Sequence, residues 1–243
     1  MTINVNRFFY FLLVVLLAGL ASCSKSKPEA QPDPTPNPTG NKSDLTCWLT
    51  DPGQAIYFKK KTKALNFSNT GNYNPSIVVD TTQTYQSIDG FGFALTGGSA
   101  YLINQLSSAT KSDLLKELFT ADSTFIGISY LRISIGASDL DASVFSYDNL
   151  PAGQTDATLE HFSINPDKAN LIPVLKAIVA LNPKIKILGS PWSAPAWMKT
   201  NGSPKGGSLQ PEFYSAYANY FVKYIQAMKA EGIPIAAITP QNE

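Results

Sequence analysis

The pattern of apolar and polar positions changes twice along the chain. Residues 8–20 form an apolar run, residues 23–46 are mostly polar and rich in proline, and the rest alternates short apolar runs with amphipathic segments. An apolar run of this length after Arg7 is too short for a comfortable membrane span and is typical of a secretory signal peptide. The pattern predicts a signal peptide over residues 1–22, an extended tether over residues 23–46, and a folded region from residue 47 onward.

The first part of the folded region, residues 47–86, predicts short strands. Residues 55–58 and 76–80 are rich in β-branched and aromatic side chains, and turn-forming Asn, Gly and Ser residues separate them. So few strands cannot make a stable sheet alone. We therefore expect them to pair with strands from another part of the protein.

Residues 87–243 alternate predicted strands with predicted helices. The strands are expected at 88–94, 129–135, 185–189 and 235–239, and the helices at 111–121, 166–181 and 211–230. Asn165 is the expected N-cap of the second helix, with Pro166 in its first turn. This order predicts a parallel α/β sheet, which fits either a doubly wound sheet or a (β/α)₈ barrel. The stretch GFGFALTGG lacks GxGxxG spacing, which argues against dinucleotide binding.

Composition narrows the function further. The formal net charge of +1 and the lack of a Lys/Arg block argue against a nucleic-acid partner, and no cofactor is implied. An uncharged ligand such as a sugar fits this balance. His161 is the only histidine, so we expect no metal cluster and a loop or capping role for it.

The two cysteines have different expected fates. The stretch Leu20-Ala21-Ser22-Cys23 resembles the bacterial lipobox, which implies cleavage before Cys23 and lipidation of its thiol. Several acyl chains would hold the protein on a membrane of the cell envelope, on the periplasmic or surface side. A buried hydrophobic helix is the alternative for the apolar run. With Cys23 acylated, Cys47 has no partner and is expected to be a free thiol.

The residues that carry candidate chemistry cluster beyond predicted strand ends. Arg132 and Asp139 bracket the end of the second strand; Trp192 and Trp197 follow the third, and Asn242 and Glu243 the fourth. In a (β/α)₈ barrel these strand ends form the active-site face. Tryptophan stacks on sugar rings, while carboxylates and amides bind hydroxyl groups. Two alternatives stay open: a fold-holding ion pair between Arg132 and Asp139, and a packing role for Trp197.

Four stretches, in this order, resemble motifs of glycoside hydrolase family 30, the glucosylceramidase-like family. They are QSIDGFGFALTGGSA (86–100), LRISIGASDL (131–140), GSPWSAPAWMKTNG (189–202) and ITPQNE (238–243). The resemblance implies a retaining β-glycosidase with Glu243 as general acid/base and Asn242 contacting the sugar 2-hydroxyl. It also implies that Trp192 and Asp139 line the sugar subsite and that Arg132 orients nearby carboxylates.

The family fold implied by the resemblance is a (β/α)₈ barrel with a side β-sandwich. Residues 47–86 would supply the N-terminal strands of the sandwich, and residues 87–243 strands 1–4 of the barrel. The nucleophilic glutamate would lie beyond residue 243, so we expect the chain to be an N-terminal fragment that is inactive alone. A non-catalytic, glycan-binding surface lipoprotein on a degenerate barrel is the alternative function.

The chain departs from the family pattern at several positions near the site. Gly97 and Gly98 stand where many members have an acidic residue, Ser134 replaces a usual proline, and Ala137-Ser138 replaces Ser-Cys. The Gly-Gly variant resembles members that act on β-1,6-glucan. We therefore expect a β-glucosidic substrate, either β-1,6-glucan or a glucosylceramide.

Overall fold

The computed structural model describes residues 43–243 apart from positions 62, 72 and 123. The described residues fall into two compact units, one ending at Tyr73 and the other comprising Asn74–Glu243. The expected signal peptide, the lipidation site Cys23 and most of the expected tether lie outside the described residues. Among the helices that are described, none combines the length and apolar character needed to cross a membrane.

The smaller unit is built around an antiparallel hairpin. Strand β1 (Trp48–Asp51) pairs with β2 (Ile56–Lys60), and the short 3₁₀ helix η1 (Pro52–Gln54) joins them. The Lys60 ammonium lies 5.1 Å from the centre of the Trp48 ring, which is a cation–π distance. Strand β2 confirms the strand predicted at 55–58, whereas β1 was not predicted. Cys47, just before β1, is a half-buried free thiol.

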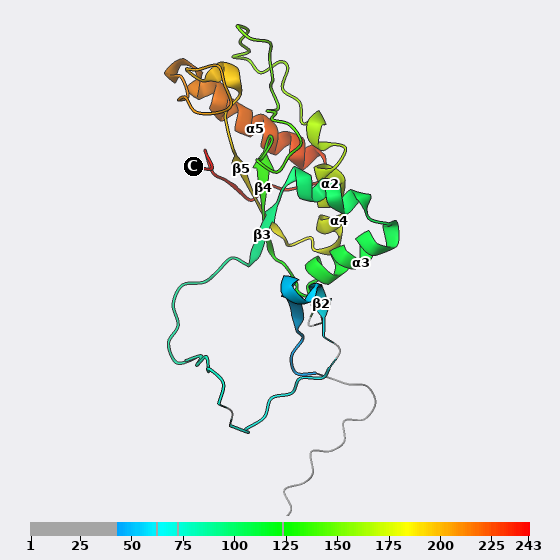
Figure 1. Ribbon diagram of the computed structural model, residues 1–243. Helices are drawn as coiled ribbons and strands as arrows, with labels where there is room; N and C mark the ends of the chain where they lie inside the picture. Colours follow the sequence, from blue (N-terminus) through cyan, green and yellow to red (C-terminus); the bar gives the residue numbers. More distant parts are fainter. Residues whose placement is uncertain (1–42, 62, 72, 123) are drawn as a thin grey trace, which may run out of the picture. The chain divides into compact units, whose positions relative to one another are not determined.

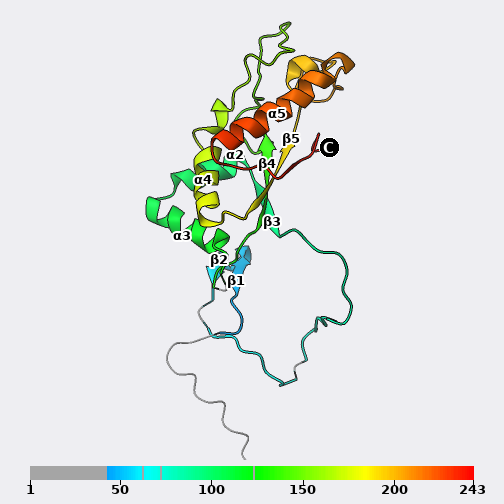
Figure 2. The same cartoon turned by 180° about the vertical axis from the view of Figure 1, so that it is seen from behind.

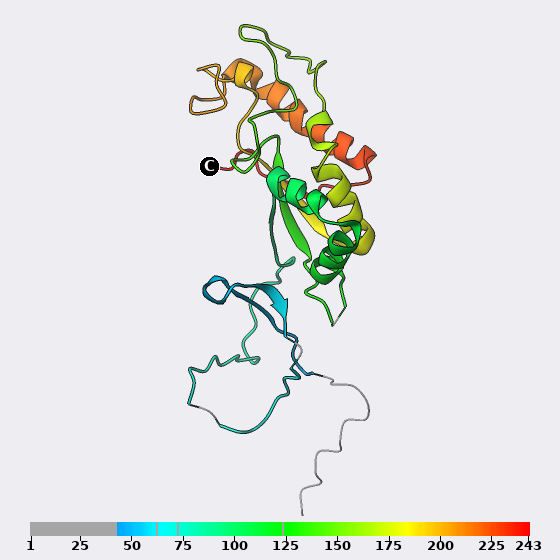
Figure 3. The ribbon, with the colours of Figure 1, turned by 45° about the vertical axis from the view of Figure 1, so that its right-hand side comes forward.

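The larger unit is an α/β structure with a parallel sheet in the order β3-β4-β5-β6. Its strands are β3 (Gly92–Leu95), β4 (Tyr130–Ile135), β5 (Lys186–Pro191) and β6 (Ala237–Ile238). Its helices are α2 (Gly97–Gln105), α3 (Ser108–Phe119), α4 (Leu171–Leu181) and α5 (Tyr214–Ala230). The views in Figures 1 and 3 place the helices on one face of the sheet. Successive parallel strands with helices between them confirm the predicted α/β class and correspond to part of a barrel.

The two faces of the sheet have different chemistry. Because side chains alternate along a strand, Leu131, Ile133 and Ile135 of β4 point to the helical face, where all three are buried in the hydrophobic core. Arg132 lies on the opposite face, in register with Leu188 of β5. Ser134, Ser190 and Thr239 share that polar face. The apolar face therefore anchors the helices, and the opposite face carries buried polar groups that bond to one another.

Three predicted elements are absent or begin at least four residues away from the predicted position. Residues 76–80 form no strand, and Ile77 is 95% exposed. Strand β3 begins at Gly92 rather than at residue 88, because the neighbouring strand β4 begins only at Tyr130, opposite Gly92. Helix α4 begins at Leu171 rather than at residue 166: Pro173 lacks an N–H and is tolerated only in a first turn, so a continuous helix from 166 would break there.

The segment around Pro166 is instead the 3₁₀ helix η2 (Asn165–Asp167), and Asn165 makes no side-chain cap.

Helix α2 was missed altogether. Its N-terminus is capped by Thr96, whose side chain accepts a hydrogen bond from the Ser99 N–H at 3.1 Å. Two glycines, which have low helix propensity, begin this helix. The predicted helix at 211–230 is confirmed as α5, preceded by the short η4 (Pro211–Phe213).

A buried aromatic cluster fixes the long loop after β4 to helix α5. The ring of Tyr147 stacks on Tyr224, with centroids 5.6 Å apart and planes 7° apart. The Tyr147 N–H donates to the Tyr220 hydroxyl oxygen at 3.0 Å, and the Tyr147 hydroxyl donates to Asp167. Burial raises the pKa of Asp167 to about 7, and the negative charge of Asp141 adds to the rise. The loop that borders the candidate site is thereby held at its middle.

Candidate functional site

Arg132 joins three segments at the polar face of the sheet. Its Nη2 donates to Ser190 Oγ of β5 at 3.1 Å and to the Asn242 side-chain oxygen, beyond β6. Its guanidinium carbon lies 4.7 Å from the centre of the Trp192 ring. The salt bridges of the described residues do not include an Arg132–Asp139 pair. Arg132 therefore holds two of the other predicted site residues, Trp192 and Asn242, in one place.

The segment after β6 is fixed along the end of β5. The Thr239 N–H donates to Gly189 O at 3.0 Å, and the Asn242 N–H donates to Pro191 O at 2.9 Å. The Gln241 side-chain amide donates to Trp192 O at 2.9 Å. Figure 2 shows this C-terminal segment, coloured red, running beside β5. These bonds place Glu243 at the carboxyl edge of the sheet, as predicted from its position after the fourth strand.

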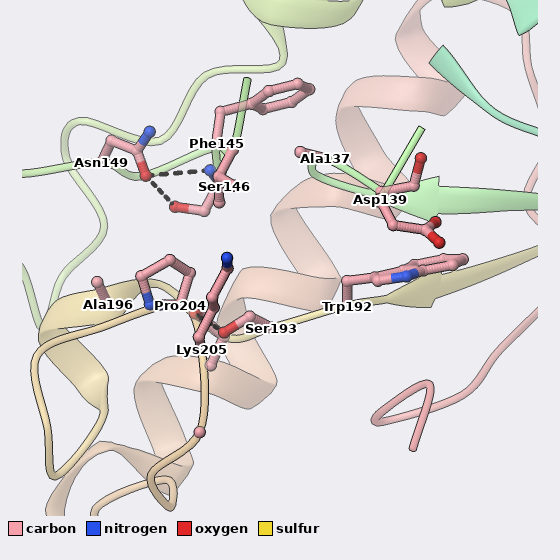
Figure 4. Close-up of a pocket in the computed structure, with 14 residues that line it drawn as sticks. Ala137, Asp139, Phe145, Ser146, Asn149, Trp192, Ser193, Ala196, Pro204 and Lys205 are labelled. Carbon is pink, nitrogen blue, oxygen red and sulfur yellow. Dashed lines mark hydrogen bonds between the residues drawn. The ribbon is translucent and has the colours of Figure 1, made fainter. Parts of the chain in front are cut away.

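A pocket of about 540 Å³ opens beside Trp192, and we call it the tryptophan pocket. Figure 4 shows Asp139 and Trp192 near one end of it and Lys205 with Pro204 near the other. Asn149 Oδ1 accepts hydrogen bonds from the Ser146 N–H and hydroxyl, at 3.0 and 2.8 Å, and so closes one wall. An aromatic ring with a carboxylate, an ammonium group and neutral hydrogen-bonding groups around it can bind a sugar ring and its hydroxyl groups.

Glu243 lines a second pocket, of about 350 Å³, which we call the glutamate pocket. Lys199 and Tyr217 line the same pocket, and Ala194 borders both pockets. Burial lowers the pKa of Lys199, whose ammonium donates to Ser193 Oγ and Pro204 O, each at 3.1 Å. The sequence singled out Trp192 and Glu243 but missed Tyr217, which lies on a helix with no motif signal. Lys199 follows the third strand in the WMKTNG stretch, close behind Trp197, but the sequence assigned it no role.

Residues 88–243 match the glycosyl hydrolase family 30 TIM-barrel domain. The chain belongs to this family. The chain is 36% identical to the endo-1,6-beta-D-glucanase BGN16.3 of Trichoderma harzianum over 209 residues, which is 78% of this chain and 42% of that protein. It is 32% identical to the lysosomal acid glucosylceramidase of Mus musculus over 176 residues, 69% of this chain and 33% of that protein.

Solved structures of family-30 relatives superpose on most of this chain. The endo-beta1,6-glucanase BT3312 is 39% identical with a TM-score of 0.62, covering 78% of this chain and 40% of that structure. SrfJ from Salmonella typhimurium is 30% identical with a TM-score of 0.65, covering 81% and 43%. The predicted family and the barrel fold are thereby confirmed. The chain spans about two fifths or less of the length of the curated relatives named here.

In this family-30 chain Trp197 does not line the tryptophan pocket. Its indole N–H donates to the Asp148 backbone oxygen at 3.1 Å, and its ring meets Phe213 edge-on with centroids 5.0 Å apart. Trp197 packs against the hydrophobic core. These contacts favour the packing alternative over ring stacking on a sugar.

His161 belongs to a cluster with two aspartates on the loop after β4. Its Nδ1 lies 2.9 Å from Asp156 Oδ2, and one carboxylate oxygen of Asp148 lies within 4.8 Å of both groups. Burial raises the pKa of Asp148 to about 6, and the charge of Asp156 adds to this. Hydrogen bonding to Asp156 raises the pKa of His161. These three donors could hold a cation, whereas the sequence predicted no metal cluster and a loop or capping role for His161. The His161–Asp156 pair satisfies both groups without one.

Proposed function

We propose that the protein containing this chain is a retaining β-glycosidase that cleaves β-glucosidic bonds, with Glu243 as its general acid/base. The observation that carries the proposal is the Arg132 bridge, which brings Trp192 and Asn242 together beside Glu243 at the carboxyl edge of the sheet. Family membership supports the same chemistry. Asp139 lines the tryptophan pocket, where its carboxylate can bind sugar hydroxyls.

Each side chain has a physical reason for its proposed role. The Asn242 oxygen accepts from Arg132, so its amide N–H groups remain to donate to a sugar oxygen. Arg132 contacts Trp192 by a cation–π interaction, which fixes the ring that lines the tryptophan pocket. Glu243 would first protonate the departing oxygen and then deprotonate the incoming water.

Double displacement also needs a nucleophilic carboxylate about 5–5.5 Å from the acid/base. Among the residues that the structure describes, Glu243 is the only glutamate within five residues beyond the end of a sheet strand. We therefore place the nucleophile, with the further strands of the barrel, in sequence beyond Glu243 in the complete protein. We likewise propose that residues 47–86 contribute to a side β-sandwich.

Three features favour β-1,6-glucan as the substrate over glucosylceramide. Several relatives that match this chain at 36–40% identity are named endo-1,6-beta-glucanases, whereas the mouse glucosylceramidase is at 32%. The Gly97-Gly98 pair points the same way. The tryptophan pocket, about 540 Å³, is also large enough for more than one sugar ring.

The test is hydrolysis by the complete purified protein of a panel of β-1,6-glucan, glucosylceramide, β-xylosides and β-1,6-galactan. We expect reducing ends to be released from β-1,6-glucan, and NMR to show the first product with the β configuration. An α-configured first product would contradict the retaining mechanism. Binding of glucan without any release of reducing ends would instead identify the non-catalytic glycan-binding lipoprotein.

We further propose that Cys23 is acylated and holds the enzyme at the cell envelope. The lipobox-like Leu20–Cys23 stretch supports this proposal. Metabolic labelling with a radioactive fatty acid should label the protein, and Cys23→Ser should abolish both the label and membrane fractionation. Labelling that survives this substitution would contradict it.

A further inference from the structure

The tight turn Ser138–Asp141 carries Asp139 at its second position. The Asp141 Oδ2 atom accepts hydrogen bonds from the Ser138 N–H at 2.7 Å and from the Ser138 hydroxyl at 2.8 Å. The Ser138 side-chain oxygen, Oγ, in turn accepts a hydrogen bond from the Leu140 N–H at 3.2 Å. Ser138 is buried, whereas Asp139 is exposed. The residues on both sides of Asp139 are thus fixed, and the Asp139 side chain projects from a rigid turn.

The same turn is packed directly against the first turn of helix α2. A Cβ atom on Gly97 would lie 2.0 Å from Asp141 Oδ1, and a Cβ atom on Gly98 would lie 2.1 Å from Leu140 O. Only glycine leaves room for these two contacts. The Asp141 carboxylate also lies against a helix N-terminus, where a negative charge is favourable.

This packing explains the departure from the family pattern at the start of α2. The acidic side chain that many members carry there is missing, and the carboxylate of Asp141 fills the space beside Gly97 instead. Asp139 borders both the tryptophan pocket and a third pocket of about 530 Å³, which Gly97 and Gly98 also line. The exposed carboxylate of Asp139 is thus carried by a turn that packs on the glycine pair.

We propose that Asp141 is the positioning residue for Asp139. Gly97 and Gly98 make this placement possible because neither has a Cβ atom that would clash with the turn. The inference rests on the proposed function, in which Asp139 binds the sugar. Asp141 lines the third pocket but neither the tryptophan pocket nor the glutamate pocket, and in this proposal it acts by holding the turn.

A double-mutant cycle on the complete protein tests this role, because two residues that act through one another are not additive. Asp141→Ala should lower kcat/KM on β-1,6-glucan on the order of 10- to 100-fold, since a small misplacement of a binding group has that effect. In an Asp139→Ala background the same substitution should change kcat/KM less than about 3-fold. Asp141→Asn keeps an oxygen acceptor for Ser138 and should restore most of the activity lost in Asp141→Ala.

Gly97→Ala provides a second, independent perturbation. The new methyl group meets the end of a flexible side chain, so Asp141 can move away at little cost in folding but loses its bonds to Ser138. We expect Gly97→Ala to lower kcat/KM as Asp141→Ala does, with a similar melting temperature, and the double variant to be no worse than either. Asp113→Ala, an exposed position on α3, is the matched control and should leave kcat/KM unchanged.

The outcomes separate this inference from the proposed function. If the unsubstituted protein hydrolyses no β-glycoside, the proposed function is wrong and the positioning role falls with it. If that protein is active but Asp141→Ala costs the same factor with and without Asp139, Asp141 supports the fold only and the positioning role is wrong. Full activity of both Asp141→Ala and Gly97→Ala would also contradict it.

Discussion

Replacing Asp167 by asparagine should stabilise the protein at neutral and alkaline pH. The carboxyl is buried beneath the aromatic cluster and accepts the hydroxyl hydrogen bond of Tyr147. Burial raises its pKa from the ordinary 3.8 to about 7, so ionising it within the fold is costly. Asparagine has nearly the same shape, keeps an oxygen for Tyr147 and carries no charge.

The size and sign of the effect follow from proton linkage. Between about pH 4 and pH 7 the folded state holds a proton at Asp167 that the unfolded state has lost, so stability falls as pH rises through this window. Above pH 7 both states are ionised and the whole penalty is present. At about 1.36 kcal/mol per pKa unit, the rise corresponds to at most ~4 kcal/mol.

The assay is urea unfolding of the complete protein and of Asp167→Asn at several values between pH 4 and pH 8.5. The two proteins should have nearly equal free energies of unfolding at pH 4. As the pH rises to about 8, the variant should become increasingly more stable than the wild type. The exposed Asp113 of α3 provides the control, since Asp113→Asn should show no such pH-dependent gain. A difference that does not change with pH, or a variant that is less stable at pH 8, would refute the reasoning.

Three further substitutions test the contacts of the site. Arg132→Lys removes the planar group that reaches Ser190 and Asn242 together; we expect kcat/KM to fall roughly 10- to 100-fold with little change in melting temperature, and equal activity would contradict the bridge. Trp197→Phe should cost about 1 kcal/mol in urea unfolding through its lost N–H bond but leave KM unchanged; a raised KM would indicate a sugar contact. Tyr224→Phe removes a buried hydroxyl without a hydrogen-bond partner, so stability should stay within about 1 kcal/mol or rise, and a larger loss would show that the hydroxyl is satisfied.

Local sequence patterns were sufficient to predict the strands and helices in which burial and periodicity agreed. The apolar runs of β4 and β5 and the helical spacing of α5 were found within a few residues of their bounds, because each buries one continuous face in the core. Residues 76–80 have a β-propensity like that of β4 and β5 but form no strand. β-Propensity reflects packing against neighbouring strands, and the described residues provide no neighbouring strand for this segment.

The site was predictable to the extent that it follows strand ends. Trp192, Asn242 and Glu243 were placed correctly at the carboxyl edge because parallel strands bring their ends together. What could not be predicted depends on side-chain contacts between distant segments. The space beside Gly97 is filled by Asp141, 44 positions away in the sequence, and no local pattern marks that contact.

The separation of the site into two pockets was equally invisible in the sequence. Trp192 and Glu243 belong to different pockets that share only Ala194 among their lining residues. The position of one pocket relative to the other depends on how the chain between β5 and α5 folds around Lys199. A motif gives the residues of such a site, whereas the shape of the site is a property of the whole loop.

The most direct test of the central claim is the rate of Glu243→Ala in the complete protein, with and without azide. Loss of the general acid should lower turnover of β-1,6-glucan on the order of 10²- to 10⁴-fold, while an aryl glucoside with a good leaving group still forms the glycosyl-enzyme. Azide attacks that intermediate without needing a base, so it should accelerate turnover of the aryl substrate and yield a β-glucosyl azide. Full activity of Glu243→Ala on the glucan, with no effect of azide, would contradict the account.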